Sequence, residues 1–448
     1  MQLSFYGAAK NVTGSNFLLE SDGTKILIDC GLFQGSHFAD LQNFEPFPYD
    51  PKEIRAVVVT HAHLDHVGRL PKLYQDGFRG MVFSTLPTRD FSELLLLDSE
   101  HILNQEAERT GRPSLCTVES IDQVMRLWKG MQYHASFMIG SFKIEFFNAG
   151  HILGSAIVKI EAEGKTIIFS GDLGNYPTPI IPPTEFFSKA DYCVMESTYG
   201  DRTHEGIEER EEVFEDVIED TVKQGGVLMI PAFALERTQG LLYHLHELFE
   251  QGRVPRVPVF IDSPLAIKLT AIYNRYKSYF NEETTNHGKF GEDILNFPGL
   301  HLTLTTEESK KINEVPAPKI IIAGSGMSHG GRILHHERRY LSDPKSTLLI
   351  VGYQADGSMG RRILEGAQSV TIFGDTVPVR CHLRTISSYS AHADQPRLLE
   401  WVSPMRASLA KVFLVHGEEK ASAVLAQKLR DEFAVDAKVP YPGETVTL

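Results

Sequence analysis

The feature that most constrains this chain is the stretch from 56 to 70, AVVVTHAHLDHVGRL. Its apolar, β-branched run at 57–60 predicts a buried strand. The strand ends at four side chains that can bind a metal ion: His61, His63, Asp65 and His66. Side chains of an extended segment repeat every second residue, so His61 and His63 should face the same point. Asp65 and His66 lead into a helix expected at 69–74 and can face a second point.

The chemistry of these side chains indicates a transition metal. Imidazole and carboxylate groups suit Zn²⁺ or a neighbouring first-row ion, whereas Ca²⁺ and Mg²⁺ sites are built from oxygen atoms. One ion could be held by the first pair and another by the second. The alternative is a polar loop that happens to be rich in histidine. That alternative does not explain why a strand, a small spacer and candidate ligands at alternating positions occur together.

Further strands deliver candidate ligands elsewhere in the chain. A strand predicted at 142–147 precedes His151, one at 166–170 precedes Asp172, and one at 412–415 precedes His416. Each would be an ordinary loop residue if taken alone. Beside the first cluster, they are the groups that a two-metal site still needs.

Three other polar residues stand at the ends of predicted elements. A strand at 191–197 contains Glu196 near its end, and His392 precedes a helix. Asp29 ends a strand predicted at 25–29, where a structural turn role is favoured over a role as ligand.

The apolar patterns of two other segments predict secondary structure. Residues 2–7 and 15–20 are expected to form a hairpin, and residues 75 to 139 a helical region with helices at 91–109 and 118–128.

The character of the sequence changes after Tyr199. An acidic helix at 205–223, with Val213, Val217 and Phe214 toward its inner face, precedes four units that each consist of an apolar strand, a loop and an amphipathic helix. This pattern is typical of a parallel sheet that is covered on both faces. We therefore expect a separate α/β domain at 201–384, inserted between the parts 1–200 and 385–448 of another domain.

Loops at the carboxyl ends of parallel strands form the binding crevice of such sheets. In the inserted domain these loops carry the expected substrate-binding residues Arg237, Ser263, Ser325, Gly326, Ser328, Tyr353, Ser358 and Arg361. The runs GSGMSHGG and ADGSMGRR could present backbone N–H groups to an anion at a helix start. Ordinary turn chemistry explains each glycine loop equally well when it is considered singly.

Charge and composition limit the function. The formal net charge of −14 argues against wholesale binding of a polyanion, although two divalent ions and local arginines could reverse the sign within a cleft. No apolar run is long enough to span a bilayer, and the first residues, MQLSFYGAAKNVTGS, do not read as a signal peptide. The four cysteines are scattered without a CxxC motif. We expect a cytoplasmic protein that does not bind membranes.

The motifs together resemble a known family. HAHLDH with His151, Asp172 and His416 resembles the metallo-β-lactamase fold, a four-layer αββα sandwich. ESTYGDR at Glu196, YSAHAD at His392 and FLVHGE at His416 resemble the additional motifs of the β-CASP nucleases, particularly the branch of the pre-mRNA 3′-end endonuclease and its prokaryotic relatives. The resemblance implies an α/β protein in which a metallo-β-lactamase αββα sandwich carries an inserted Rossmann-like parallel-sheet β-CASP domain.

The resemblance also implies the site. Two Zn²⁺ ions would be bound per chain, the first by His61, His63 and His151 and the second by Asp65, His66 and His416, with Asp172 as the bridge. The expected catalytic residues are Asp65, Glu196 and His392, of which the last two act on the leaving group. Asp29 matches a motif in which the acid orients the ligand loop.

The implied activity is zinc-dependent hydrolysis of single-stranded RNA by a two-metal hydroxide mechanism, leaving a 5′-phosphate and a 3′-hydroxyl. An endonuclease is expected, although a 5′-exonuclease would use the same site. Two alternatives are a metallo-hydrolase of a small-molecule ester, thioester or lactone, and an inactive RNA-binding subunit. The small-molecule hydrolase leaves the insert without a role, and the inactive subunit does not explain why all seven ligands are retained. The sequence leaves open whether the chain forms a homodimer.

Overall fold

The computed structural model describes residues 1–35, 41–111, 113–204, 206–287, 293–352, 354, 357–386 and 389–448. The chain divides into two compact units. The first unit combines Met1–Thr203 with His392–Leu448, and the second is His204–Ala391. The metal-ligand candidates all belong to the first unit.

The first unit contains two sheets of seven strands. One has the strand order β22-β1-β2-β3-β4-β5-β6. Its strands are β1 (Gln2–Phe5), β2 (Phe17–Ser21), β3 (Thr24–Ile28), β4 (Ile54–Val58), β5 (Met81–Thr85), β6 (Trp128–Met131) and β22 (Glu444–Thr447). The predicted hairpin is confirmed, since β1 and β2 pair in antiparallel fashion.

The second sheet has the order β21-β20-β11-β10-β9-β8-β7. Its strands are β7 (Phe137–Ile139), β8 (Phe142–Asn148), β9 (Ala156–Ala162), β10 (Lys165–Phe169), β11 (Tyr192–Glu196), β20 (Lys411–Val415) and β21 (Ala437–Lys438). Strand β20 pairs in parallel with β11, although more than 200 residues separate them in the sequence. This pairing returns the last part of the chain to the sheet that was begun before the insert.

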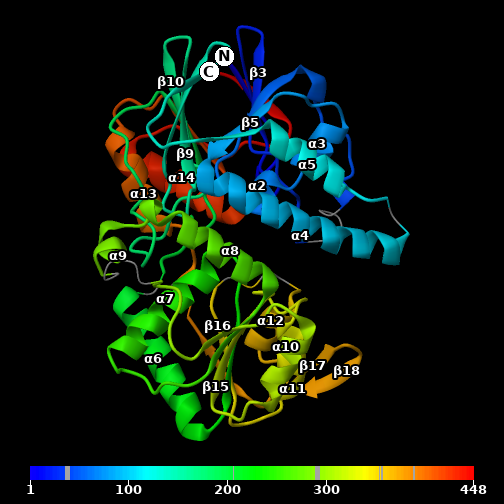
Figure 1. The fold of residues 1–448 in the computed structure, drawn as a ribbon. Coiled ribbons are helices and arrows are strands. Elements are labelled where there is room, and N and C mark those ends of the chain that lie inside the picture. Colours follow the sequence, from blue (N-terminus) through cyan, green and yellow to red (C-terminus); the bar gives the residue numbers. More distant parts are fainter. Residues whose placement is uncertain are drawn as a thin grey trace. The chain divides into compact units, whose positions relative to one another are not determined.

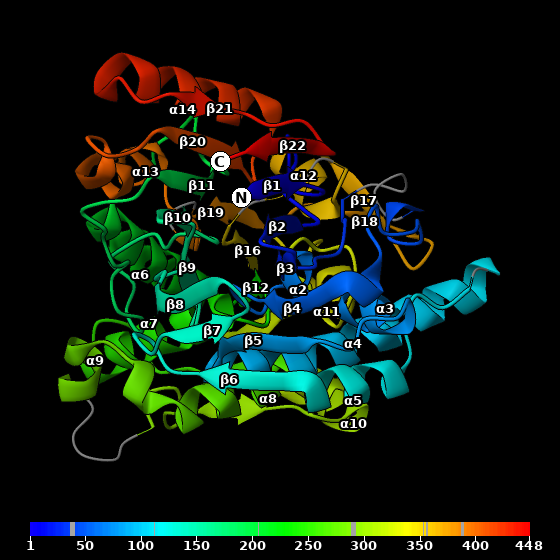
Figure 2. The same ribbon diagram turned by 90° about the horizontal axis from the view of Figure 1, so that it is seen from above.

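Apolar side chains fill three layers of the first unit. The central core joins both sheets, with Phe5 and Ile26 from one and Phe146 and Ile160 from the other. A second core lies between one sheet and α13 (Gln395–Val402) and α14 (Glu419–Phe433). A third lies between the other sheet and the helices α3 (Leu70–Gln75), α4 (Leu86–Thr110) and α5 (Val118–Leu127). Figures 1 and 2 show these helices on the outer faces of the paired sheets. The predicted αββα sandwich is confirmed.

The segment from 75 to 139 departs from its predicted helical character. It does contain α4 (Leu86–Thr110) and α5 (Val118–Leu127), but β5, β6 and β7 also fall within it. These strands are short, and β6 and β7 lie at sheet edges, so pairing with neighbouring strands rather than a long apolar run determines them. The helix expected at 69–74 is preceded by α2 (Leu64–Val67), and α3 covers Leu70–Gln75.

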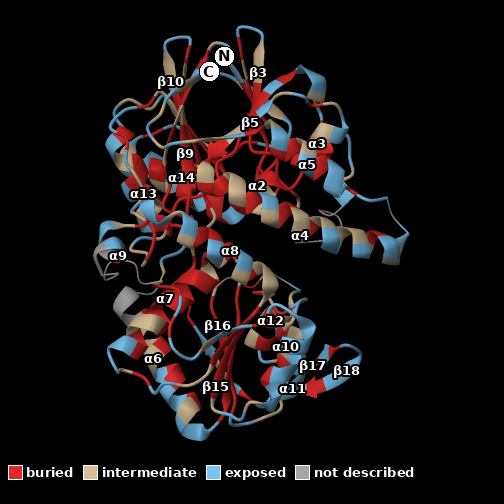
Figure 3. Cartoon of the chain, viewed as in Figure 1, coloured by how far each residue is buried: buried red, intermediate tan, exposed pale blue. Residues whose placement is uncertain are grey.

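The second unit is built on a parallel sheet of the order β14-β13-β15-β12-β16-β19. Its strands are β12 (Val227–Pro231), β13 (Val259–Asp262), β14 (Leu300–Leu302), β15 (Lys319–Ala323), β16 (Thr347–Ile350) and β19 (His382–Thr385). A hairpin of β17 (Ser369–Ile372) and β18 (Asp375–Pro378) stands beside it. Figure 3 shows the central strands β15 and β16 of this sheet buried. The edge strands β14 and β19 are largely exposed.

Helices accompany each strand of that sheet. They are α6 (Ile207–Gln224), α7 (Arg237–Glu250), α8 (Pro264–Arg275), α9 (Glu282–His287), α10 (Thr306–Lys311), α11 (Ile333–Tyr340) and α12 (Met359–Leu364). Short 3₁₀ turns lie at Pro51–Glu53, Lys277–Tyr279, Ile312–Glu314 and Ser403–Met405. Phe214 and Val217 of α6 are buried, whereas Val213 is only partly buried. The described residues of the insert thus show the predicted alternation of strands and helices.

The compact second unit begins and ends slightly later than the expected 201–384. At its start, Arg202 still belongs to the first unit because its carbonyl accepts a hydrogen bond from the Gln395 amide. At its end, β19 pairs with β16, and Tyr389 beyond it bonds to α7 through His244. Tertiary contacts therefore set both boundaries.

No helix in the described parts of the chain is both long and apolar enough to cross a membrane. All four cysteines are buried and unbonded to one another.

Candidate metal centre

The HAHLDH loop is fixed by backbone hydrogen bonds to neighbouring segments. The Asp65 carbonyl accepts from the Ser15 amide at 2.8 Å, and the His66 carbonyl accepts from the Cys30 amide at 2.7 Å. Gly31 passes so close that a Cβ atom there would lie 1.6 Å from the Asp65 carbonyl oxygen. These contacts fix the backbone of the loop against the neighbouring segments.

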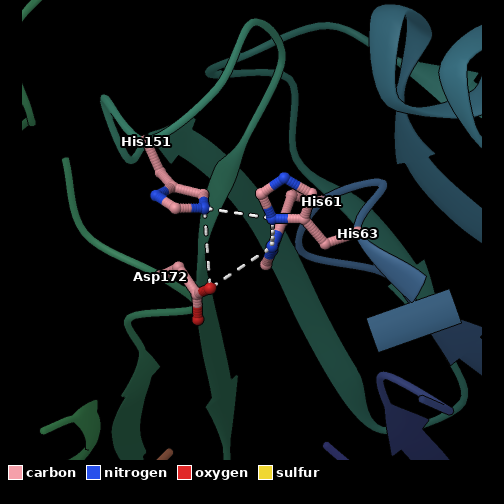
Figure 4. Close-up of side chains that lie close together, drawn as sticks. All are labelled: His61, His63, His151 and Asp172. Carbon is pink, nitrogen blue, oxygen red and sulfur yellow. Dashed lines mark hydrogen bonds and ion pairs between the residues drawn. The ribbon is translucent and has the colours of Figure 1, made fainter. Parts of the chain in front are cut away.

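Three histidines converge at the first position. His61 Nε2 lies 3.0 Å from His63 Nδ1, and His151 Nε2 lies 3.2 Å from the same atom. Asp172 Oδ2 completes the group at 3.4 Å from His61 Nε2 and 3.6 Å from His151 Nε2. Figure 4 shows the three rings and the carboxylate pointing toward a common centre. All four ligand atoms lie within 4.8 Å of one another.

A second group lies beside the first. Asp65 Oδ2 is 3.1 Å from His416 Nε2 and 3.7 Å from His66 Nε2. The other oxygen of the central carboxylate, Asp172 Oδ1, lies 3.4 Å from His66 Nε2 and 3.7 Å from His416 Nδ1. Asp172 therefore turns one oxygen to each group of ligands, as a bridging carboxylate would.

Burial sets the protonation of the histidines in the first group. Burial lowers the pKa of His61 well below its usual value, and the neighbouring imidazoles lower it further. Burial likewise lowers the pKa of His63 to about 4. Both rings are therefore neutral at pH 7, which is the form that binds a metal ion.

Nearby carboxylates determine the pKa of His66 in the second group. Burial opposes charge on His66, but the carboxylates of Asp172 and Asp29 outweigh it and raise the pKa of His66 to about 10, so an ion bound by this ring would displace a proton. Burial raises the pKa of Asp172 despite the nearby histidines. Four acids, Asp29, Asp65, Asp172 and Glu196, thus lie around one largely buried centre.

This donor set fits a pair of metal ions. Nitrogen atoms of the three rings lie only 3.0–3.2 Å apart and can all turn toward one ion. Asp172 Oδ1 is buried and has no hydrogen-bond partner among the described residues. Buried carboxylates gathered without balancing cations are costly, so ions bound here would neutralise them.

Residues that hydrogen-bond to the candidate ligands orient their rings. Asp29, with φ at 60°, accepts hydrogen bonds from the Thr60 amide and hydroxyl and lies 2.7 Å from His66 Nδ1. Thr198 Oγ1 is 3.0 Å from His416 Nδ1. Neither Thr60 nor Thr198 was assigned a role from the sequence, although Thr60 directly precedes His61 and Thr198 lies two residues after Glu196. Such partners fix the ring orientation of histidine ligands.

Glu196 and His392 form a pair at the edge of the ligand groups. Their atoms Oε2 and Nδ1 are 3.2 Å apart, and His392 Nδ1 also lies 3.7 Å from Asp172 Oδ2. Glu196 is fully buried, and its other oxygen accepts from the Leu173 amide. Burial opposes charge on His392, but Glu196 and Asp172 outweigh it and raise its pKa to about 9.

The expected substrate-binding residues lie in loops of the second unit. Ser263 caps α8, and Ser358 caps α12. Ser325 Oγ accepts from the amides of His329 and Gly330, and the Gly326 carbonyl accepts from Nε2 of Gln354.

The remaining candidates differ in exposure. Ser328 is buried and donates to Glu337 Oε1, whereas Arg361 is half-exposed and pairs with Glu365. Arg237 begins α7. Tyr353 lies outside the described residues.

Sequence profiles of known domains match three parts of the chain. Residues 18–181 match a metallo-β-lactamase superfamily domain, 238–363 match a Beta-Casp domain, and 376–440 match a Zn-dependent metallo-hydrolase RNA specificity domain. Ribonuclease TTHA0252 of Thermus thermophilus is 40% identical over 96% of each chain. The chain belongs to the β-CASP family of RNA nucleases. This membership confirms the resemblance that the motifs predicted and disfavours the small-molecule hydrolase.

Other β-CASP relatives extend the comparison. Transcription termination factor FttA of Methanosarcina mazei is 32% identical over all of this chain and 72% of its own length. FttA of Methanocaldococcus jannaschii is 30% identical over 98% of this chain and 70% of its own. A protein of unknown function from Enterococcus faecalis shares the fold, with a TM-score of 0.58 and 12% identity over 100% of this chain and 99% of that one.

Proposed function

We propose that this β-CASP protein is a zinc-dependent ribonuclease that hydrolyses phosphodiester bonds of single-stranded RNA with two metal ions. The placement of Asp172 carries this proposal, since its two oxygens face two separate groups of ligands. Histidine-rich nitrogen and oxygen donors favour Zn²⁺ over Mg²⁺ or Ca²⁺. The first ion would be held by His61, His63 and His151 and the second by Asp65, His66 and His416.

The two ions would supply a nucleophile at neutral pH and stabilise charge on the phosphoryl oxygens. The chain's own residues must then protonate the leaving 3′-oxygen. His392 suits this role because the carboxylate of Glu196 holds its Nδ1 and favours the protonated ring. The products would be a 5′-phosphate and a 3′-hydroxyl.

Purified protein should contain about two zinc ions per chain and cleave labelled single-stranded RNA. A chelator should abolish cleavage, and added Zn²⁺ should restore it. A lactone and a thioester, tested beside the RNA, serve as controls for small-molecule hydrolysis. Protein that contained two zinc ions yet cleaved only the lactone or thioester would refute the ribonuclease proposal.

The second unit would bind RNA phosphates through its loops. If Arg361 contacts one phosphate, Arg361→Ala should flatten the slope of log K against log salt by about 0.7. The control is Arg397→Ala, because both arginines are ion-paired and their side chains are 40% and 41% exposed. Equal slopes for the two variants would remove Arg361 from the RNA-binding surface.

A further inference from the structure

A buried arginine in the second unit lacks the partners that buried charges normally have. Arg210 of α6 is only 6% exposed. Its Nε is buried without a hydrogen-bond partner, and no ion pair holds its guanidinium among the described residues. By contrast, the buried Lys319 donates to the carbonyls of Ile312 and Val315. Burying an unpaired charge is costly, so a ligand that supplies the missing negative charge would explain Arg210.

A second arginine shares the same aromatic neighbour. The guanidinium carbons of Arg210 and Arg237 lie 5.2 Å and 5.7 Å from the ring centroid of Tyr389. Tyr389 is 4% exposed, and its hydroxyl lies 2.7 Å from His244 Nδ1. The ring therefore holds two cations close together in the interior of the unit.

Neither Tyr389 nor His244 carries a negative charge that would compensate the two arginines. Burial and, to a smaller extent, the charge of Arg210 together lower the pKa of His244 to about 3, so the imidazole is neutral. Burial raises the pKa of Tyr389, so the phenol keeps its proton at neutral pH, and its oxygen is hydrogen-bonded to His244 Nδ1. Glu211 is close enough to act on Tyr389 but forms no ion pair with Arg210 in the described structure. The surroundings of Arg210 are thus electropositive. Near Arg237 the buried carboxyl of Glu236 interacts with the guanidinium, but burial raises the pKa of Glu236 to about 7, so its charge compensates Arg237 only in part.

The cluster stands at the edge of the sheet where ligands of parallel α/β folds bind. Arg237 follows β12, and Tyr389 follows β19. Gly352 follows β16, and a Cβ there would lie 3.9 Å from Arg237 Nε and Nη2. These three strands are neighbours in the sheet, so their carboxyl ends meet at one place.

We propose that Arg210 and Arg237, held by Tyr389, form a binding subsite for a backbone phosphate of the RNA substrate. The proposal rests on the ribonuclease function proposed above and adds Arg210, which is not among the residues expected from the sequence. Planar guanidinium groups match phosphate oxygens and tolerate partial burial better than lysine.

The test is Arg210→Met, which keeps the bulk of the side chain and removes its charge. RNA affinity should fall roughly tenfold or more, and the salt slope should flatten by about 0.7. The melting temperature of the free protein should stay the same or rise, because an uncompensated buried charge is removed. Arg210→Lys should recover the salt slope but only part of the affinity.

The control is Arg256→Ala, which removes one positive charge from an exposed ion pair with Glu250 in the same unit. Its salt slope should equal that of the wild type. In a further arm, RNA should raise the melting temperature of the wild type at concentrations where inorganic phosphate does not. If inorganic phosphate stabilises the wild type as well as RNA does, the ligand is a free anion and the RNA subsite is wrong.

Two other results would overturn the subsite. One is an Arg210→Met protein with wild-type affinity and salt slope. The other is a loss of affinity accompanied by a lower melting temperature, which would make Arg210 a structural residue. Wild-type protein that cleaves no RNA would instead refute the proposed function, so the two failures are distinguishable.

Discussion

Replacing His392 by alanine should lower the rate of RNA cleavage on the order of 10²- to 10⁴-fold, while zinc content and RNA affinity stay near wild type. The reason is that Nδ1 of His392 faces Glu196 at 3.2 Å, an arrangement that orients a general acid. Single-turnover cleavage, elemental analysis and RNA binding of the same preparation measure the three quantities.

An RNA with a 3′-thio leaving group at the scissile bond provides the control for this variant. Sulfur departs without protonation, so the defect of His392→Ala should shrink on that substrate. His392 also lies within 4.8 Å of Asp172 and His416, a grouping that could hold an ion. A variant that lost zinc, or that was equally impaired on both substrates, would show that His392 is not the general acid.

Asp172→Ala should remove zinc from both positions. Loss of a residue that only hydrogen-bonds to a metal ligand typically lowers activity roughly 10- to 100-fold, and the loss of cleavage in Asp172→Ala should be larger. The carboxylate turns Oδ2 toward His61 and His151 and Oδ1 toward His66, so its loss affects both groups. Zinc per chain and cleavage rate are the readouts, measured after gentle purification.

Asp262→Ala is the matched control for Asp172→Ala. Asp262 is a fully buried acid of the second unit that pairs with Arg332 and His336. Its loss should destabilise the protein yet leave the zinc content of the first unit unchanged. Were Asp172→Ala to keep both ions and full activity, Asp172 could not be the bridge.

Local spacing explains why the ligand cluster could be predicted from the sequence. His61, His63, Asp65 and His66 lie on one loop, so their proximity follows from chain geometry alone. The apolar strands of the insert were similarly evident, because strands covered on both faces consist almost wholly of apolar residues.

Arg210 shows where sequence reasoning missed a candidate. It stands in the acidic run EEREEV, where it reads as one more solvated charge. A signal was nevertheless present, because Arg210, Phe214 and Val217 follow helical spacing and the latter two are buried. Its proximity to Tyr389 depends on the packing of two segments almost 180 residues apart.

The sequence by itself determined the candidate ligands, the strands that carry them and the presence of an inserted parallel sheet, because each depends on residues close together in the chain. Only the tertiary structure decided that β20 lies beside β11, which brings His416 to Asp65 across 351 residues. It also decided that β22 pairs with β1 and that β5 and β6 extend the same sheet. Strand pairing over such separations depends on the burial of whole faces, which no local pattern encodes.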